Sequence, residues 1–122
     1  MTTATRTVQN ELEIVELTHR DLGLQYKQIA RIVGADESTL HRWMSGTTPS
    51  GPRQVYRSRL AALRELYDEL RAAFRSVEAA KKWFWEDRPP SFRGATPAEL
   101  VLDGRIERVT GLLENFENGV LS

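Results

Sequence analysis

The stretch Tyr26–Ser45, YKQIARIVGADESTLHRWMS, decides the fold of the first half of the chain. It predicts two short helices joined by a turn. Ile29 and Val33 are four residues apart and therefore share one face of the first helix. Ala30 is small enough for two helices to cross closely beside it, and Gly34 tolerates the left-handed backbone that ends a helix. Together these features indicate a pair of closely packed helices.

The second helix of this pair is expected to begin after Asp36, whose carboxylate can accept a hydrogen bond from a free backbone N–H near Thr39. Its apolar face is formed by Leu40, Trp43 and Met44. An ordinary helical hairpin would show the same features. The glycine, the alanine and the apolar positions also agree in spacing with the helix-turn-helix of Xre-type DNA-binding proteins, which this stretch resembles.

This resemblance implies that the second helix enters the major groove of DNA. Its expected outer face carries four polar residues: Ser38, His41, Arg42 and Ser45. Arg42 can donate two hydrogen bonds to a guanine. Phosphate contacts are expected from four basic residues nearby: Lys27, Arg31, Arg53 and Arg57. Because so few phosphate contacts bind DNA weakly, we expect binding to require a homodimer or a larger assembly.

The composition narrows the possible functions. The 122 residues include 17 basic and 17 acidic side chains, a balance that counts against strong DNA binding by one copy. There is no cysteine, so disulfides and thiolate metal sites are excluded. The N-terminal sequence MTTATRTVQN lacks the apolar core of a signal peptide, and no apolar run is long enough to span a bilayer. We therefore expect a soluble, cytoplasmic protein.

No arrangement of residues predicts an enzyme. His19 and His41 are the only histidines and lie in different predicted helices. Metalloprotease, nucleophile-elbow and phosphate-binding glycine motifs are all missing from the sequence. The acidic residues Glu65, Asp68 and Glu69 alternate with arginines, which is typical of a solvated helix face. We therefore expect no catalytic residue, no cofactor and no metal site.

Nearly the whole chain is predicted to be helical, in an all-α fold with no strand. A loose tail is expected at residues 1–7 and a first helix at about 8–22, which Gly23 can terminate. Residues at helical spacing form the apolar stripe of this first helix: Val8, Leu12, Val15, His19 and Leu22.

A long helix is expected after Pro52, a residue that suits the first turn of a helix. Its apolar residues alternate four and three positions apart: Tyr56, Leu60, Leu63, Tyr67, Leu70 and Phe74. Such a seam is typical of an antiparallel bundle or of a coiled coil. Intramolecular packing and a short dimeric zipper are both consistent with its length.

The second half has its own start and stop signals. Ser76 can cap a helix that runs to about Trp85, and the adjacent prolines within residues 87–94 forbid helix there. Thr96 and Glu99 form a capping box with a proline between them, which is a strong start signal for a short helix. A final helix from about Arg105 to residue 119 places four apolar residues on one face: Ile106, Val109, Leu113 and Phe116.

Three consecutive aromatic residues, Trp83, Phe84 and Trp85, cannot all face one core, because successive helical side chains point in different directions. We expect Trp83 and Phe84 to point inward and Trp85 to lie toward the rim. There Trp85 can either be covered by the proline loop or contact a partner, since tryptophan is frequent at interface hot spots.

The second half resembles the toxin-binding domain of Xre/MbcA/ParS-type antitoxins over about residues 74–122. The resemblance rests on a series of short motifs and their order: Phe74-Arg75-Ser76, Ala79-Ala80, Trp83, the proline loop, Gly94-Ala95-Thr96-Pro97-Ala98-Glu99-Leu100, Asp103-Gly104, Val109, Leu113 and Gly119. A helix-turn-helix ahead of this domain is the usual order in that family. The resemblance thus implies a helix-turn-helix domain at 8–57, a connecting helix at 58–75 and a toxin-binding domain at 76–122.

This family resemblance implies an antitoxin of a toxin–antitoxin pair whose partner is a RES-domain toxin, an enzyme that destroys NAD. The antitoxin would block the active site of the toxin and, in complex, bind the promoter of its own operon. Besides Trp85, the implied toxin contacts are the C-terminal residues and a loop: Gly119, Val120, Leu121, Ser122, Arg93 and Gly94. The alternative is a stand-alone transcriptional regulator whose C-terminal helices serve dimerisation or ligand sensing.

Overall fold

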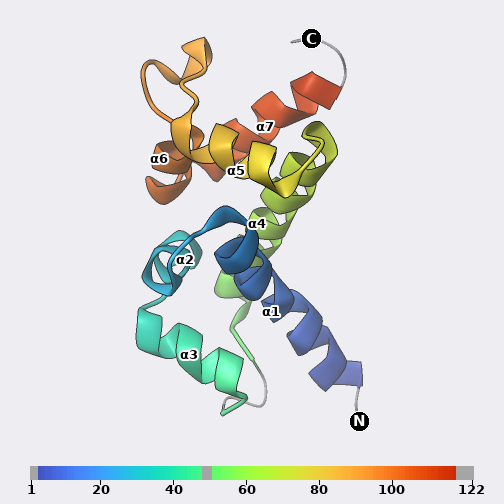
Figure 1. Cartoon of the computed structure of the whole chain (residues 1–122). Helices are drawn as coiled ribbons and strands as arrows, with labels where there is room; N and C mark the ends of the chain where they lie inside the picture. The colour runs from blue at the N-terminus through green and yellow to red at the C-terminus, as the bar shows by residue number, and fades with distance from the viewer. Residues whose placement is uncertain (1–2, 48–50, 118–122) are drawn as a thin grey trace.

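The computed structural model describes residues 3–47 and 51–117, and these residues form only helices and the turns between them (Figure 1). The all-α prediction is confirmed. The elements are α1 (Thr3–Leu22), α2 (Tyr26–Val33), α3 (Glu37–Ser45), α4 (Gln54–Ala73), α5 (Val77–Glu86), the 3-10 helix η1 (Pro90–Phe92), α6 (Pro97–Leu102) and α7 (Ile106–Glu117). Figure 1 shows α1–α3 in the lower half, α5–α7 in the upper half, and α4 running between them.

Helix α1 is longer than expected, because residues 3–7 continue it rather than forming a tail. No glycine or proline interrupts the sequence between Thr3 and Leu22, so nothing stops the helix earlier. Leu12, Val15 and Leu22 are buried as the stripe predicts, but His19 is exposed; the side chain of residue 8 lies outside the described part. The polar residue buried in its place is Thr18, whose hydroxyl donates to the Ile14 carbonyl (2.8 Å).

The predicted helix pair is present, with the turn and cap as expected. Gly34 adopts a left-handed φ of 90°, and its N–H donates to the Ala30 carbonyl at 2.9 Å. The carboxylate of Asp36 accepts from the backbone N–H of Thr39 at 2.8 Å and begins α3. These bonds satisfy backbone groups that the ends of short helices would otherwise leave unpaired.

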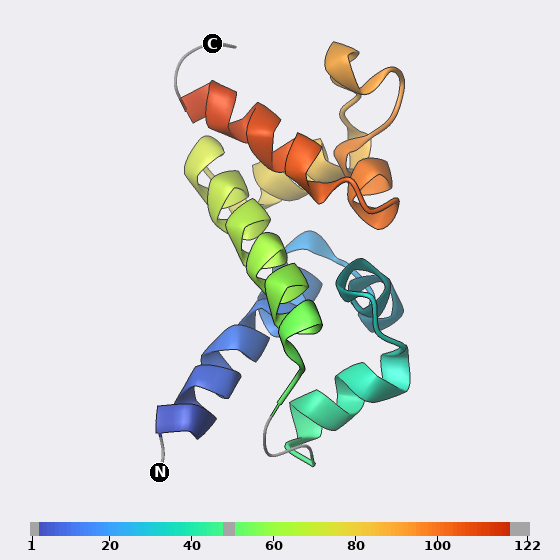
Figure 2. The same cartoon turned by 180° about the vertical axis from the view of Figure 1, so that it is seen from behind.

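Helix α4 begins at Gln54 with Arg53 as its N-cap, so Pro52 precedes the helix instead of opening it. The seam residues Leu60, Leu63, Tyr67 and Leu70 are buried, and they pack within the chain against α1 and α7 (Figure 2). Leu66, which the seam omits, is also fully buried. An additional buried position is needed because α4 packs against α1, α2, α5 and α7 and not along a single seam.

The second half is organised by two helix caps and a proline turn. The Ser76 hydroxyl accepts from the Ala79 N–H (3.1 Å), and Thr96 and Glu99 form the reciprocal capping box (2.7 and 3.1 Å). The segment 87–94, expected as loop, contains the single 3-10 turn η1. A proline at the first position of such a turn loses nothing, because its backbone needs no N–H there.

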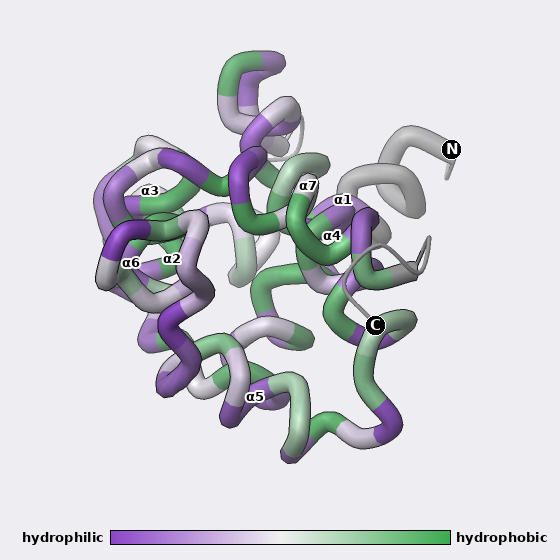
Figure 3. The backbone as a smooth tube through the Cα atoms, turned by 90° about the horizontal axis from the view of Figure 1, so that it is seen from above, coloured by the Kyte–Doolittle hydropathy of each residue, from purple (hydrophilic) through white to green (hydrophobic). Residues whose placement is uncertain are grey.

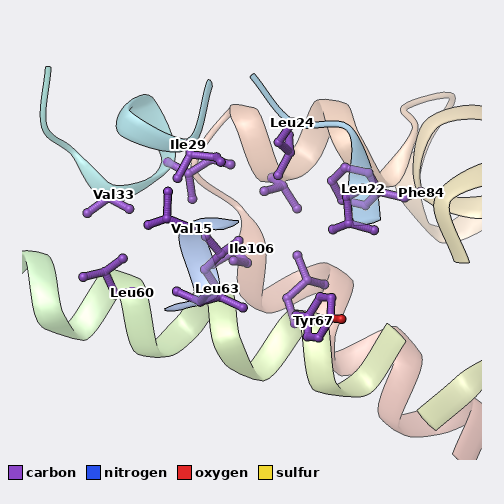
Figure 4. Close-up of a cluster of buried hydrophobic side chains, with 14 of the residues drawn as sticks. Val15, Leu22, Leu24, Ile29, Val33, Leu60, Leu63, Tyr67, Phe84 and Ile106 are labelled. Carbon is purple, nitrogen blue, oxygen red and sulfur yellow. The ribbon is translucent and has the colours of Figure 1, made fainter. Parts of the chain in front are cut away.

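The buried apolar side chains of both halves belong to one cluster. Figure 4 shows α4 residues Leu60, Leu63 and Tyr67 facing Val15 and Ile106, which come from α1 and α7. Hydrophobic and hydrophilic residues are interspersed along the helices, as expected for amphipathic helices around a shared core (Figure 3). The predicted domain boundaries at 57/58 and 75/76 therefore do not separate two cores, and the first of them falls inside α4. They remain a proposal about which part of the chain binds DNA and which part binds the toxin.

A buried polar network joins α1 to α4. The Tyr67 hydroxyl donates to Asp21 Oδ2 at 2.5 Å, Arg20 Nε donates to Asp21 Oδ1 at 2.7 Å, and Arg71 donates to the Tyr67 oxygen at 3.0 Å. The hydrogen bond from Arg20, together with that from Tyr67, holds the pKa of the Asp21 carboxyl below its ordinary value, although burial acts against this. The network therefore depends on an ionised Asp21.

We predict that Asp21→Asn destabilises the protein by about 1–3 kcal/mol at pH 7, because a buried charge-assisted network loses its acceptor charge. The folded-state pKa is lowered, so this contribution is complete above the unfolded-state value of about 3.9 and is lost as the pH falls through the folded-state pKa. Urea unfolding at pH 7 and pH 3 should show a smaller difference from wild type at pH 3. The exposed Asp68→Asn is the control, and an equal loss at both pH values would contradict the assignment.

Candidate DNA-binding and partner-docking surfaces

The outer face of α3 presents the four residues expected to reach DNA bases, and all four are exposed: Ser38, His41, Arg42 and Ser45. Arg42 Nη2 donates to the Thr39 hydroxyl at 2.9 Å, which directs the guanidinium along the helix surface. The Ser38 hydroxyl donates to the Asp36 cap at 3.0 Å. Arg42 keeps further N–H groups for a ligand, because this contact uses only one nitrogen.

His41 is held by an aromatic stack that the sequence did not indicate. The rings of His19 and Tyr26 stack with centroids 4.1 Å apart, and Tyr26 meets His41 edge-on at 5.5 Å. The Tyr26 hydroxyl donates to Glu16 at 2.5 Å, and the His41 ring lies 3.3 Å from the Glu37 carboxylate. Side chains of α1, α2 and α3 thus fix one another, although they are far apart in sequence.

The basic residues expected to contact phosphate differ in their surroundings. Lys27 and Arg53 are exposed. The prediction that Arg57 contacts phosphate is wrong, because its guanidinium donates two hydrogen bonds of 2.8 Å to the Glu11 carboxylate. Arg31 is exposed but lines a cleft of about 550 Å³ between α2 and α6.

The charges are unevenly distributed along the chain, although the net charge is zero. Residues 23–60 contain six basic and two acidic side chains, so the remaining residues carry the acidic excess. Residues 8–22 add four acidic side chains and one basic one, so the helix-turn-helix domain predicted at 8–57 has six of each and is as balanced as the whole chain. The basic excess is therefore confined to α2, α3 and the start of α4.

The opposite end of the molecule carries an apolar groove, which we call the end groove. It lies between the segment 87–92 and α7 and has a volume of about 650 Å³. Its apolar lining is Pro89, Pro90, Phe92, Leu112 and Phe116, and its polar lining is Asp87, Ser91, Arg108 and Asn115. Arg108 Nη2 donates to the Ser91 carbonyl at 2.8 Å, and its guanidinium lies 5.8 Å from the centre of the Phe92 ring. Helix α7 and the proline turn are therefore bonded together across the groove.

Next to the end groove lies an aromatic cluster of Phe74, Trp83 and Phe116, contributed by the end of α4 and by α5 and α7. Ring centroids are 5.5 Å apart for Phe74 and Trp83, 5.8 Å for Trp83 and Phe116, and 6.5 Å for Phe74 and Phe116. All three rings are only partly buried. Sequence periodicity placed Phe74 in the seam of the long helix and Phe116 on the apolar face of the final helix, but it did not bring them together with Trp83.

Trp85 lies at the rim, as predicted, but Trp83 does too: it is only partly buried, against the prediction that it points inward. Trp85 is also tied to the first half of the chain. Its indole N–H donates to the Leu22 carbonyl at 2.5 Å, and its ring packs edge-on against the buried Phe84 (5.3 Å). This contact connects α5 to the end of α1 and gives Trp85 a structural role. A contact of Trp85 with a partner stays a prediction.

The two loop residues expected to touch the toxin lie beside a residue expected to touch DNA. Arg93 and Gly94 line the same cleft as Arg31, and both have left-handed backbone, with φ of 53° and 93°. The Gly94 carbonyl accepts a hydrogen bond from Arg88. The remaining expected contacts, Gly119, Val120, Leu121 and Ser122, lie outside the described residues.

Within residues 3–47 and 51–117, no group of three or more histidine or acidic side chains is arranged to hold a metal ion. None of the helices in this part of the chain combines the length and the apolar character needed to cross a membrane.

The fold is a helix-turn-helix followed by a second group of helices, α5–α7, beside which the end groove lies. The chain is 31% identical over 99 residues to the mycobacterial cidal antitoxin MbcA of Mycobacterium tuberculosis (strain ATCC 25618 / H37Rv) and of Mycobacterium bovis (strain ATCC BAA-935 / AF2122/97), covering 81% of this chain and 84% of each relative. It therefore belongs to the MbcA antitoxin family. This membership makes it an antitoxin and not an enzyme, and favours that function over a stand-alone regulator.

A solved structure gives the same result. A chain of the crystal structure of the M. tuberculosis MbcT–MbcA toxin–antitoxin complex matches with a TM-score of 0.64 and 28% sequence identity, over 91% of this chain and 96% of that chain. No protein-family model matches the chain.

We predict that Trp85→Phe destabilises the chain by about 1–2 kcal/mol, because the Leu22 carbonyl loses its donor while most of the ring packing remains. Trp83→Phe is the matched control: it removes the same atoms, but the Trp83 indole donates no hydrogen bond within the described residues. Urea unfolding measures both changes. A Trp85→Phe variant no less stable than Trp83→Phe would contradict the structural role.

Proposed function

We propose that this antitoxin neutralises a cognate RES-domain, NAD-degrading toxin by covering its active site, and that its helix-turn-helix binds the operator DNA of its own operon. The observation that carries the proposal is the match over 91% of the chain to a toxin–antitoxin complex. The partner of MbcA in that complex is the toxin MbcT, and a cognate toxin is the corresponding partner here. The cytoplasm is the compartment we propose for the chain and both partners.

The arrangement of the two surfaces supports two separate binding tasks. Helix α3 lies at the lower end of the molecule in Figure 1, while η1 and the last turns of α7 lie at the upper end. A toxin bound at the upper end leaves the outer face of α3 open to DNA. A homodimer within a larger toxin–antitoxin assembly would double the number of phosphate contacts, which strengthens DNA binding.

The proposed means of neutralisation uses the C-terminal residues. Val120 and Leu121 are apolar and stand three and four positions after Glu117, the last residue of α7. Apolar residues of this kind are stabilised when a partner pocket removes them from water. The pocket proposed for them is the mouth of the nucleotide site of the toxin.

We predict that deleting Val120-Leu121-Ser122 weakens neutralisation while leaving the fold and operator binding intact, because these residues follow the last described helix. The measurement is bacterial growth with the adjacent toxin gene expressed beside the truncated or the full-length chain. Circular dichroism of the purified truncated chain is the control for folding. Full protection by the truncated chain would refute the role of these residues while leaving the antitoxin assignment intact.

We predict that Arg42→Ala weakens operator binding by the toxin–antitoxin complex by about tenfold or more, because one bidentate base contact contributes about 1–3 kcal/mol. The control Arg75→Ala removes an equal charge just after the C-terminal end of α4, away from α3. It should have little effect on operator binding. Binding is measured by fluorescence anisotropy with DNA from upstream of the operon at fixed salt. Equal affinities of the two variants would show that α3 does not read the operator.

A further inference from the structure

The wall of the end groove is held by hydrogen bonds within the chain. Its proline turn is closed by backbone bonds from Phe92 to Pro89 (2.9 Å) and from Arg93 to Pro90 (3.2 Å). Phe92 and Pro89 are buried, so the turn is anchored to the body of the protein. A preformed apolar groove of this kind binds a ligand at a lower entropic cost than a surface that must first rearrange.

We propose that the end groove receives an apolar side chain of the cognate toxin, carried on a segment with a neighbouring carboxylate that pairs with Arg108. This inference rests on the proposed function and names the surface by which the toxin docks. It places the main anchor of the complex between η1 and α7. The C-terminal residues, which are proposed to cover the active site of the toxin, come later in the sequence.

The chemistry of the groove selects such an occupant. Prolines and aromatic or aliphatic side chains form most of its wall, so a buried apolar anchor is favoured. The charged side chains in this wall are Arg108 and Asp87, and both are exposed. The contact of Arg108 with Ser91 leaves other guanidinium N–H groups unused. A carboxylate that meets these groups can form a charge-assisted hydrogen bond.

The position of the groove favours the toxin over a second copy of this chain. Phe116 belongs both to the groove and to the aromatic cluster, so the two form one partly exposed apolar surface. That surface borders the end of α7, from which the proposed active-site plug continues in sequence. One partner can therefore occupy the groove and meet the plug together.

A smaller groove on the other side of α7 provides a built-in comparison. It lies between α4 and α7 and is lined by Glu65, Glu107 and Glu114 together with small residues such as Ala62 and Gly111. Its acidic lining would repel the carboxylate of the proposed occupant. Asn115 faces the end groove and its neighbour Glu114 faces the acidic one, so the same substitution can be tested on both sides.

The experiment compares Asn115→Trp with Glu114→Trp, both in the full chain. Both residues are exposed, so neither change removes a core side chain, and thermal melts check that both variants fold. Affinity for the purified toxin encoded by the adjacent gene is measured by isothermal titration. We expect Asn115→Trp to fill the end groove and weaken binding by at least about tenfold, as expected when a hot-spot pocket is blocked. Glu114→Trp should stay within about threefold of wild type.

The proposed pairing of Arg108 with a toxin carboxylate is tested by comparing Arg108→Glu with Arg105→Glu. Arg105 lies three residues before Arg108, next to the first residue of α7. Only Arg108→Glu should weaken toxin binding.

The inference would be overturned by any of three results with the tryptophan variants: wild-type affinity of Asn115→Trp, equal weakening by both variants, or weakening by Glu114→Trp alone. A changed oligomeric state of the free Asn115→Trp chain, seen by light scattering with unchanged toxin affinity, would assign the groove to a second copy instead. Failure of the wild-type chain to bind the toxin would refute the proposed function itself.

Discussion

The burial of α4 between α1 and α7 is the interaction on which the rest of the structure depends. Its four leucines at 60, 63, 66 and 70 are almost completely buried. Each buried leucine contributes about 1.5–3 kcal/mol, so the four together match the total stability of a small domain, about 5–15 kcal/mol. Because these leucines pack against both halves, the helix-turn-helix and the end groove are parts of one body. The two binding surfaces are therefore held in a fixed relation.

Local signals predicted much of this fold. The caps at Asp36, Ser76 and Thr96 and the left-handed Gly34 all depend on residues close in sequence, and each forms as expected. The same local reasoning failed where a distant partner decides the outcome. Arg57 looked available for phosphate, but Glu11 on α1 binds it. His19 fitted an apolar stripe, but it stacks on Tyr26 outside the core.

The candidate sites also divide into those set by residues close in sequence and those set by distant partners. The exposed residues of α3 could be predicted because the face of a short helix follows from its buried residues. The end groove could not, since it requires η1 to lie beside α7 and Arg108 to bond Ser91 across the gap. Trp85 illustrates both cases: its place at the rim follows from helical geometry, whereas its bond to Leu22 depends on the tertiary fold.

We propose that a single body with one shared core carries a toxin-facing end and a DNA-facing end. Hydrogen–deuterium exchange of the chain, alone and with its toxin, tests this claim most directly. The account predicts new protection in residues 87–93 and 106–117 and unchanged exchange in α3. New protection concentrated in α3, or none at the upper end, would contradict it.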